Sequence, residues 1–423
     1  MSSDRDFQDI VAELFRSAAD INKTVSINGA LIDLPKIIIP LAQALATESY
    51  TPGRYTMFVV PDPKPREIFA PSLPDRICHN WIVRQLEPWW DKRFIDDNYA
   101  NRLERGTLAA SNKLQTLLRK PDHIWYCQID INAFFPSINK PVLQIILERD
   151  LARCPMSDRR RSTLWSAIKA ILAHDPTNPP PRKSGDTTLL KLIPRHKSLY
   201  GSAPGCGLPI GCHTSQFFAN IYLNELDQYV KHELRLSGYV RYMDDIVFLA
   251  ETKETLARHK ADIEAFLTNR LRVRLNPTKT RLQRYDQGIR FVGNILYPYH
   301  SHKSTKTVKA LRRRLTYFNH VLAAGAAFRR IPHMDDHWRL WFSENIAFEE
   351  TGQPTRALLN RMLATLNSYY GLLRHTNSYQ IRKTLYDQDF ALLLRYFRPK
   401  NGQYTSMRIY PKRNRTTIPK DWV

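Results

Sequence analysis

Apolar residues recur at helical spacing along much of the chain, with short β-like runs between the periodic segments. The spacing predicts helices within residues 1–50, 77–118, 139–173, 214–234 and 253–270, and a mostly helical stretch from Pro298 to about residue 396. Residues 214–234 have the pattern of a long amphipathic helix. Helices are therefore expected to alternate with short strands.

The β-like runs predict several short strands. Two runs within residues 55–69 are separated by charged and proline residues, which is typical of a basic hairpin. Further strands are expected in WYCQID (125–130), VRLN (273–276) and IRFVGNILY (289–297). DPTNPPPRKSGD (175–186) is proline-rich and polar, which predicts a loop, either ordered or disordered. The tail after Phe397 has little apolar periodicity.

Two adjacent aspartates interrupt the apolar run GYVRYMDDIVFLA. If Tyr239–Met243 and Ile246–Leu249 form a hairpin, Asp244 and Asp245 occupy its tight turn, which suits aspartate. Asp130 stands at the end of another strand. Three carboxylates at the ends of neighbouring strands would bind hard cations such as Mg²⁺, which prefer oxygen ligands. The alternatives are solvated turn aspartates for the pair and a helix N-cap for Asp130.

The charge of the chain indicates its partners. Sixty-three Lys and Arg against 40 Asp and Glu give a formal net charge of +23. An excess of this size favours a polyanion, with nucleic acid before an acidic membrane. No apolar run is long enough for a bilayer, and the polar start MSSDRDFQDI lacks the apolar segment of a signal peptide. We expect a soluble intracellular protein, with no membrane partner.

The five cysteines are scattered and form no CxxC pair. They support neither a disulfide framework nor a zinc site, and we expect buried free thiols.

The order of motifs resembles the reverse transcriptase family. QIDINAFFPSI is followed by GLPIGCHTSQFFANIYLNELD, RYMDDIVFL, RLNPTKT and IRFVGNIL, and KPREIFAPSLPDRICHN stands upstream. The resemblance covers roughly residues 50–385 and implies an α+β right-hand polymerase fold. In that fold an antiparallel palm sheet packs on helices beside fingers and a helical thumb.

The resemblance implies a division of the chain into domains. The expected parts are an N-terminal helical extension (1–50), fingers and palm (51–298), a basic helical thumb (299–396) and a basic tail (397–423). Within 51–298 the fingers would take about 51–125 and 140–200, and the palm about 126–139 and 201–298.

The family's catalytic residues carry over residue by residue. Asp130, Asp244 and Asp245 resemble the metal-binding carboxylates, and Ile131 would supply a backbone carbonyl. They would hold two Mg²⁺ ions, for which Mn²⁺ can substitute. The residues that resemble the family's nucleotide contacts are Lys64, Arg66, Arg76, Phe134, Phe135, Pro209, Ile210, Gly211, Gln216 and Lys279.

Several of these nucleotide contacts have a second interpretation. Phe135 stands where the family keeps the aromatic side chain that excludes a ribose 2′-hydroxyl, whereas Phe134 fits equally a core position. Lys64 and Arg66 could lie on a solvated hairpin face, and Lys279 could be a surface lysine after a turn. Ile210 replaces the Gln of many relatives, so base selection at this contact is expected to be looser.

Primer and template contacts are expected at two places. Tyr242 and Met243 precede the aspartate pair, and Gly293 fits the turn of the family's primer grip. In KSTKTVKALRRRL the basic residues at helical spacing would form one face suited to a duplex backbone, namely Lys306, Lys309, Arg312 and Arg313. A merely solvated face is the alternative.

Within the family, residues 193–224 resemble the prokaryotic branch of diversity-generating retroelement and defence-associated enzymes, which implies a location in the prokaryotic cytoplasm. Cys212-His213 departs from the residues usual in the retroelement enzymes, which favours an anti-phage defence role. No endonuclease, integrase or RNase H motif is recognisable, so the expected template is a non-coding RNA from the enzyme's own locus.

The expected partners are this RNA, a DNA primer or product, deoxynucleoside triphosphates, and an accessory protein or a second copy of the chain. Two other functions stay open. One is a non-catalytic, maturase-like RNA-binding protein. The other is RNA-templated RNA synthesis, which Phe135 disfavours.

Overall fold

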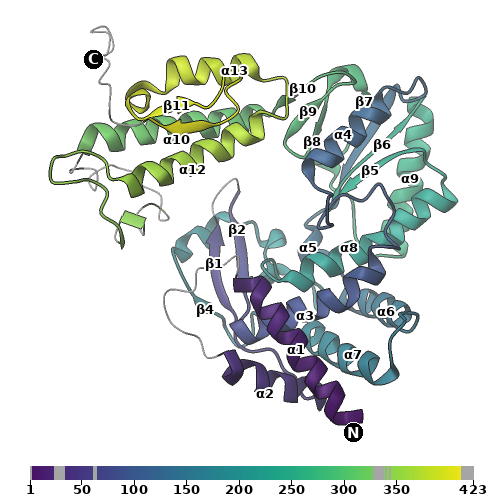
Figure 1. Ribbon diagram of the computed structural model, residues 1–423. Helices are drawn as coiled ribbons and strands as arrows, with labels where there is room; N and C mark the ends of the chain where they lie inside the picture. Colours follow the sequence, from purple (N-terminus) through teal and green to yellow (C-terminus); the bar gives the residue numbers. More distant parts are fainter. Residues whose placement is uncertain are drawn as a thin grey trace. The chain divides into compact units, whose positions relative to one another are not determined.

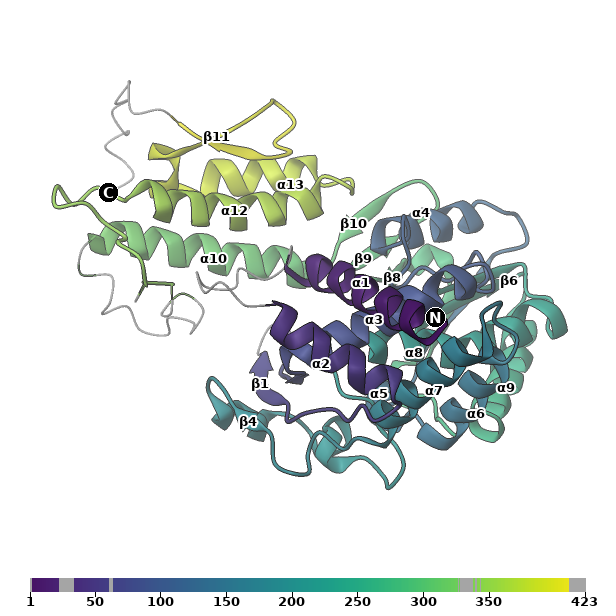
Figure 2. The ribbon, with the colours of Figure 1, turned by 60° about the horizontal axis from the view of Figure 1, so that its bottom comes forward.

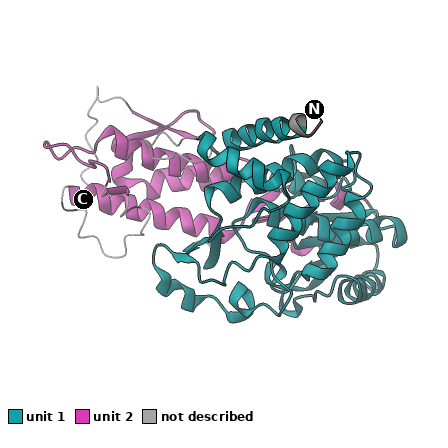
Figure 3. Cartoon of the chain, turned by 90° about the horizontal axis from the view of Figure 1, so that it is seen from below, with its two compact units in different colours: residues 1–113, 121–284 teal, residues 114–120, 285–423 magenta. Residues whose placement is uncertain are grey.

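The computed structural model describes residues 2–22, 34–60, 64–325 and 344–410, together with residues 327, 338, 341 and 342. The chain divides into two compact units (Figure 3). Unit 1 contains residues 1–113 and 121–284, and unit 2 contains residues 114–120 and 285–423. Among the described helices, none combines the length and the apolar character needed to span a bilayer.

Unit 1 is built on a four-stranded antiparallel sheet with the strand order β5-β6-β3-β7. Strands β5, β6 and β7 of this sheet are labelled in Figure 1. Its strands are β3 (Trp125–Asp130), β5 (Gly238–Tyr242), β6 (Asp245–Ala250) and β7 (Arg281–Arg284). Side chains alternate between the faces of a strand, so Cys127, Ile129, Ile246 and Phe248 share one face. All four are buried in the main core.

Helices pack around this sheet, and the expected α+β fold is confirmed. The helices of unit 1 are α1 (Ser2–Asn22), α2 (Leu34–Ala46), α3 (Leu73–Trp90), α5 (Phe134–Ser137), α6 (Lys140–Leu151), α7 (Asp158–Ala173), α8 (His213–Gln228) and α9 (Lys253–Asn269). The helix α4 (Thr107–Leu118) crosses the boundary between the units. Helices α1, α2 and α3 lie side by side (Figure 2).

Local signals fix several helix starts. Ser72, Ser157 and Thr252 stand at the N-caps of α3, α7 and α9, where each hydroxyl accepts a bond from a backbone N–H three residues later. Such caps typically contribute about 1 kcal/mol each to stability.

Helix α8 differs from its predicted form. The amphipathic pattern predicted one solvated face, but α8 is buried on nearly every side, including the polar Asn220, Asn224 and Asp227. It packs against α3, α6 and α9, and a π-helical turn (Tyr229–Glu233) continues it. A helix this enclosed must pair its buried polar side chains within the protein.

The basic hairpin is confirmed. Strands β1 (Thr56–Val60) and β2 (Arg66–Ala70) pair antiparallel, and the tip at 61–63 lies outside the described residues. Residues 175–186 form a loop that contributes a short strand, β4 (Arg182–Lys183), parallel to β1. Three 3-10 turns follow, at Thr187–Leu192, Arg195–Lys197 and Leu199–Gly201.

Two predictions of local structure were wrong. Residues 91–106 interrupt the helix expected over 77–118. The run VRLN is not a strand, and only Leu275 within it forms an isolated bridge, to Ile131. The strand lies further on, at β7, after a 3-10 turn at Pro277–Lys279. Ile131 and Leu275 therefore pair as a single bridge, and the residues beside Leu275 add no further strand pairing.

Unit 2 has its own core, formed by α10 (Thr305–Ala324), α12 (Arg356–Leu373) and the segments after them. Helices α10 and α12 run side by side (Figure 2). The remaining elements are β8 (Ile289–Phe291), β9 (Asn294–Leu296), β10 (Ser301–Lys303), α13 (Tyr379–Thr384), β11 (Phe397–Pro399) and β12 (Met407–Ile409), with single turns at Tyr285–Gln287, Leu385–Asp389 and Ala391–Arg395. Phe397 and Met407 are fully buried, so the start of the tail belongs to this core; residues 411–423 lie outside the described residues.

Candidate active site

Strand register brings Asp130 and Asp245 together. They are direct partners across β3 and β6, a position in which Cβ atoms lie about 5 Å apart. Tyr242 pairs with Asp245 on the other side, so the turn consists of Met243 and Asp244 alone. The prediction that both aspartates occupy the turn was therefore wrong by one residue, because Asp245 is the first residue of β6.

Alternation along the strands explains why these charges are tolerated. Asp130 and Asp245 point to the face opposite to that of Ile129 and Ile246, which are buried in the core. Asp130, Asp244 and Asp245 are all only partly buried. The carboxylates thus line an accessible end of the sheet instead of its packed face.

Two polar side chains hold the carboxylates in place. Lys279, on the 3-10 turn before β7, donates to Asp130 Oδ2 at 2.6 Å, and the Lys279 side chain is 45% exposed. Gln128 Nε2 donates to Asp245 Oδ1 at 2.9 Å. The charge of Asp130 is thereby partly compensated by an exposed ammonium group that is free to exchange partners.

Asp244 is electrostatically disfavoured. Burial, followed by the negative charge of Asp130, raises the pKa of its carboxyl, while Lys279 and Arg66 act in the opposite direction. Negative charge concentrated at this turn is the condition that a hard cation relieves.

The backbone carbonyl of Ile131 is a further oxygen near these carboxylates. Asn132 N–H donates to Arg274 O and Asn276 N–H donates to Asp130 O, both at 2.8 Å. This makes Ile131 and Leu275 a non-hydrogen-bonded antiparallel pair, in which N–H and C=O point away from the partner. The Ile131 carbonyl therefore points to the β6 side, where Asp245 lies.

The donor set fits a divalent cation in chemistry, since it offers carboxylate oxygens and a carbonyl. Across the ranges that the structure describes, however, no three acidic, His or Cys side chains converge closely enough to hold a metal as they stand. Lys279 and Gln128 each occupy one carboxylate oxygen, of Asp130 and Asp245 respectively, and compete with a cation for that oxygen.

The predicted nucleotide-binding residues come from segments that bond to one another. Leu208 N–H donates to Phe135 O at 2.9 Å, and Phe69 N–H on β2 donates to Ile210 O at 2.8 Å. Gly211 has a φ of +118°, and a Cβ there would lie 2.8 Å from the Phe69 carbonyl oxygen. Only glycine allows this close approach, which ties the loop at 207–211 to the strand that begins with Arg66.

The two neighbouring phenylalanines have different environments. Phe134 is 3% exposed and belongs to the core, whereas Phe135 is half-buried at the edge of it. Ala133, just before them, has a φ of +46°, a left-handed conformation that is strained for a non-glycine residue. Of the pair, Phe135 is the side chain with a surface available to a ligand.

The other predicted nucleotide contacts lie on several elements of unit 1. Lys64 is exposed just before β2, Arg76 is half-buried on α3, Gln216 is exposed on α8, and Pro209 is half-buried in the loop before α8. Their contacts with a nucleotide stay predictions.

The predicted primer and template contacts fall in both units. Tyr242 and Met243 are half-buried beside the carboxylates of unit 1. In unit 2, Val292 and Gly293 both have positive φ, +43° and +82°, which defines a tight β8–β9 hairpin of the I′ type. The four predicted basic residues of α10, Lys306, Lys309, Arg312 and Arg313, are all exposed, whereas Arg314 on the same helix is half-buried. Arg312 pairs with Asp389 at 3.2 Å.

A family comparison decides the relationship. The family described as reverse transcriptase (RNA-dependent DNA polymerase) matches residues 61–296, more than half of the chain. This chain belongs to the reverse transcriptase family. The matched range contains Asp130, Asp244 and Asp245, and the right-hand polymerase fold is that of the family.

One curated relative shares about a quarter of its aligned residues with this chain. Protein YkfC of Escherichia coli (strain K12) is 26% identical over 282 residues, which cover 58% of this chain and 66% of YkfC.

Among solved structures, telomerase from Candida albicans in complex with a telomeric RNA fragment has a TM-score of 0.41 at 12% identity, covering 81% of this chain and 60% of its own. Apo telomerase from Candida tropicalis, truncated from its C-terminal domain, also has a TM-score of 0.41 at 12% identity, covering 59% and 55%. The family assignment does not depend on these distant likenesses.

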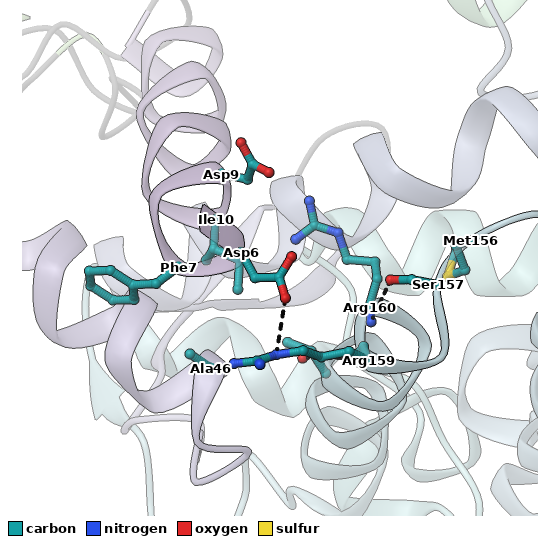
Figure 4. Close-up of a pocket in the computed structure, with 10 residues that line it drawn as sticks. Asp6, Phe7, Asp9, Ile10, Ala46, Met156, Ser157, Arg159 and Arg160 are labelled. Carbon is teal, nitrogen blue, oxygen red and sulfur yellow. Dashed lines mark hydrogen bonds and ion pairs between the residues drawn. The ribbon is translucent and has the colours of Figure 1, made fainter. Parts of the chain in front are cut away.

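A pocket of about 260 Å³ lies away from the reverse transcriptase site residues, between the start of α1 and the start of α7 (Figure 4). Asp6 and Arg159 form an ion pair of 3.3 Å across it, and Ser157 caps α7 at its wall. Asp130, Asp244 and Asp245 are not among the residues that line this pocket. It is formed where two helices meet, and both of its arginines pair with acids of α1, Arg159 with Asp6 and Arg160 with Glu13.

Sequence reasoning missed the residues that support the carboxylate turn. Arg241 and Asp227 are completely buried and bond to each other, and Arg241 also reaches the Met243 carbonyl. The sequence contains a signal for this pair, because the alternation of the strand places Arg241 on the same core-facing side as Tyr239. A buried arginine requires a buried acid, and the helix before the strand offers Asp227.

Asp244→Asn should raise the free energy of unfolding of the metal-free protein at pH 7. The raised pKa of Asp244 means that its ionised form destabilises the fold at neutral pH. The gain should shrink as the pH falls toward about 4, the ordinary pKa of an unfolded-state aspartate, because the folded-state carboxyl with its raised pKa takes up a proton on the way. Urea unfolding in EDTA across this range measures it. Asp262→Asn, at an exposed position on α9, is the control; an equal gain there, or none at Asp244, contradicts the assignment.

Lys279→Met should tighten Mn²⁺ binding to the protein several-fold. It removes the positive charge that competes with a cation for Asp130. Isothermal titration without nucleotide measures the affinity, and Lys253→Met, an exposed lysine beyond the other end of β6, is the matched control. Unchanged or weaker binding in Lys279→Met would show that this contact does not compete with metal.

Proposed function

We propose that this chain is an RNA-directed DNA polymerase, a nucleotidyltransferase that adds deoxynucleotides to a primer on an RNA template. The single observation that carries the proposal is the direct pairing of Asp130 with Asp245, beside Asp244 in the adjoining turn. Membership of the reverse transcriptase family and the net charge of +23 support it.

The carboxylates would hold two Mg²⁺ ions, with Mn²⁺ as a substitute. When bound, such a pair activates the primer 3′-hydroxyl and stabilises the leaving pyrophosphate. Lys279 bonds to Asp130. When this carboxylate binds a cation, the ammonium group of Lys279 would leave it and bind the triphosphate instead. The positive charge of Arg66 acts to lower the pKa of Asp244, so this arginine influences the same carboxylate cluster.

Phe135 is proposed to select deoxynucleotides. It is the half-buried member of the phenylalanine pair, and its carbonyl anchors the loop that contains Ile210. Its aromatic ring would collide with a ribose 2′-hydroxyl, while the apolar Ile210 would contact the template or nucleotide without a hydrogen bond. Lys64, Arg76, Gln216 and the backbone at Pro209 and Gly211 are proposed to complete the nucleotide site.

The nucleic-acid duplex is proposed to contact Tyr242, Met243, the Gly293 turn and the basic face of α10. Among the described residues, three of the four basic side chains on that face form no ion pair, namely Lys306, Lys309 and Arg313. Arginine and lysine side chains of this kind bind phosphates, with an affinity that falls steeply with salt.

The biological role is proposed to be anti-phage defence in the prokaryotic cytoplasm, with a non-coding RNA from the same locus as template. The residues before and within α8 support this branch, and the alternative is the mutagenic reverse transcriptase of a diversity-generating retroelement. Sequencing the RNA and DNA that co-purify with the chain from cells separates the two roles. A faithful copy of one structured RNA supports the first, and a copy rich in substitutions supports the second.

Asp244→Asn combined with Asp245→Asn should abolish deoxynucleotide incorporation on a primed RNA template. Losing the cation ligands removes several kcal/mol of transition-state stabilisation, a decrease of at least about a thousand-fold. Primer extension with Mg²⁺ measures it, and thermal unfolding and RNA binding should stay close to those of the parent. Incorporation at the parent rate would refute the active site; a parent that binds RNA but never polymerises would indicate a non-catalytic RNA-binding protein.

Phe135→Val should increase the incorporation of ribonucleotides relative to deoxynucleotides by roughly 10- to 100-fold, because it removes the ring that excludes the 2′-hydroxyl. Ratios of kcat/KM for matched ribo- and deoxynucleotides measure the change. Phe134→Leu, in the core, should leave the ratio unchanged. Equal ratios in the parent and Phe135→Val would assign nucleotide selection to another residue.

A further inference from the structure

A completely buried ion pair lies directly beneath the carboxylate turn. Arg241 on β5 and Asp227 on α8 both have fully buried side chains. The guanidinium binds the carboxylate with two bonds, Nε to Oδ1 at 2.8 Å and Nη2 to Oδ2 at 2.5 Å. Tyr239 O–H donates to the same Asp227 Oδ1 at 2.8 Å. A bidentate pair of this kind has a fixed geometry as well as a strong attraction.

The third nitrogen of Arg241 reaches out of the pair toward the turn. Nη1 donates to Met243 O at 3.2 Å and to Asn220 Oδ1 at 3.1 Å. Asn220 in turn donates to Ala100 O at 2.6 Å. The guanidinium therefore connects the central helix α8, the strand β5 and the peptide that joins Met243 to Asp244.

The backbone of Arg241 is held as firmly as its side chain. Its N–H donates to Asp97 O at 2.9 Å, and its carbonyl accepts from Tyr99 N–H at 3.0 Å. The segment 97–99 thus covers the outer edge of β5. Arg241 cannot shift without breaking bonds to two other parts of unit 1.

The turn that Arg241 contacts is strained. Met243 has a φ of +54°, in the left-handed region that a non-glycine residue adopts only when its surroundings enforce it. Its carbonyl is the group that Arg241 binds, and Asn101 Nδ2 also contacts Met243 Sδ at 3.4 Å. The direction of the Met243–Asp244 peptide determines where Asp244 points.

We propose that Arg241, oriented by Asp227, is a positioning residue that fixes the left-handed Met243 turn and thereby directs the Asp244 carboxylate toward Asp130. This inference rests on the proposed function, since it concerns the same carboxylates. A buried ion pair is a poor device for stability alone, because apolar residues of similar volume serve as well or better. The pair is explained by the extra bond to the turn, which no apolar side chain can make.

Two variants of different design test this role. Arg241→Met combined with Asp227→Leu removes both charges at similar volume, and such replacements commonly preserve folding. Arg241→Lys keeps a positive charge for Asp227, but a single ammonium cannot reproduce the planar fork that serves Asp227 and Met243 together. If the double variant fails to fold, Arg241→Lys still tests the proposal. Tyr239→Phe is the matched control, because it removes one bond to Asp227 and leaves the contact with Met243 intact.

The direct measurement is amide hydrogen exchange across Tyr242–Asp245, together with Mn²⁺ affinity by isothermal titration. Exchange at the turn should accelerate at least tenfold and Mn²⁺ should bind at least tenfold more weakly in both variants, with thermal unfolding near that of the parent. In primer extension, kcat should fall while the KM for the deoxynucleotide stays the same. Tyr239→Phe should match the parent in all of these.

A folded variant with parental exchange and parental Mn²⁺ affinity would overturn the positioning role. Failure of the proposed function gives a different result. In that case the parent itself neither binds Mn²⁺ at these carboxylates nor incorporates nucleotides, while turn exchange still responds to Arg241 if the positioning is correct.

Discussion

The antiparallel register of β3 and β6 is the constraint on which the rest of the site depends. It pairs Asp130 with Asp245, and the register of β5 with β6 leaves two residues, Met243 and Asp244, for the turn. A slip of one residue in either strand would turn its aspartate toward the core face and move its isoleucine, Ile129 or Ile246, out of the core. The burial of those isoleucines therefore fixes the positions of the carboxylates, and the hydrophobic effect determines the geometry of a polar site.

Charge is managed differently on the two faces of the sheet. At the accessible end of one face, Asp130 and Asp245 have exchangeable partners, an exposed lysine and a glutamine. On the core face, Arg241 and Asp227 form a permanent pair, because an unpaired charge there would be prohibitively costly. The exchangeable contacts suit a site that must accept cations and release a product, and the permanent pair suits the support beneath it.

Much of this could be predicted from the sequence because the relevant signals are local. The helices, the basic hairpin and the α+β class follow from periodicity and turn residues, and the order of the motifs along the chain indicates the family. The turn was misplaced by one residue because an Asp-Asp pair suits a turn as well as a strand start. The sequence of α8 predicts an amphipathic helix because its Asn and Asp residues are typical of a solvated face. Their actual partners, such as Ala100 and Arg241, are distant in sequence and cannot be identified from the pattern. Contacts between residues distant in sequence, including Lys279 with Asp130, leave no periodic signal.

The central claim is that Asp130 at the end of β3, Asp245 at the start of β6 and Asp244 in the β5–β6 turn together bind a pair of divalent cations. An anomalous difference map from crystals grown with Mn²⁺, a primed RNA template and a non-hydrolysable deoxynucleotide tests it directly. The account predicts two peaks between Asp130 and the Asp244–Asp245 pair, with Lys279 moved from Asp130 to the triphosphate. Peaks elsewhere, or an unchanged Lys279–Asp130 contact with nucleotide bound, would contradict it.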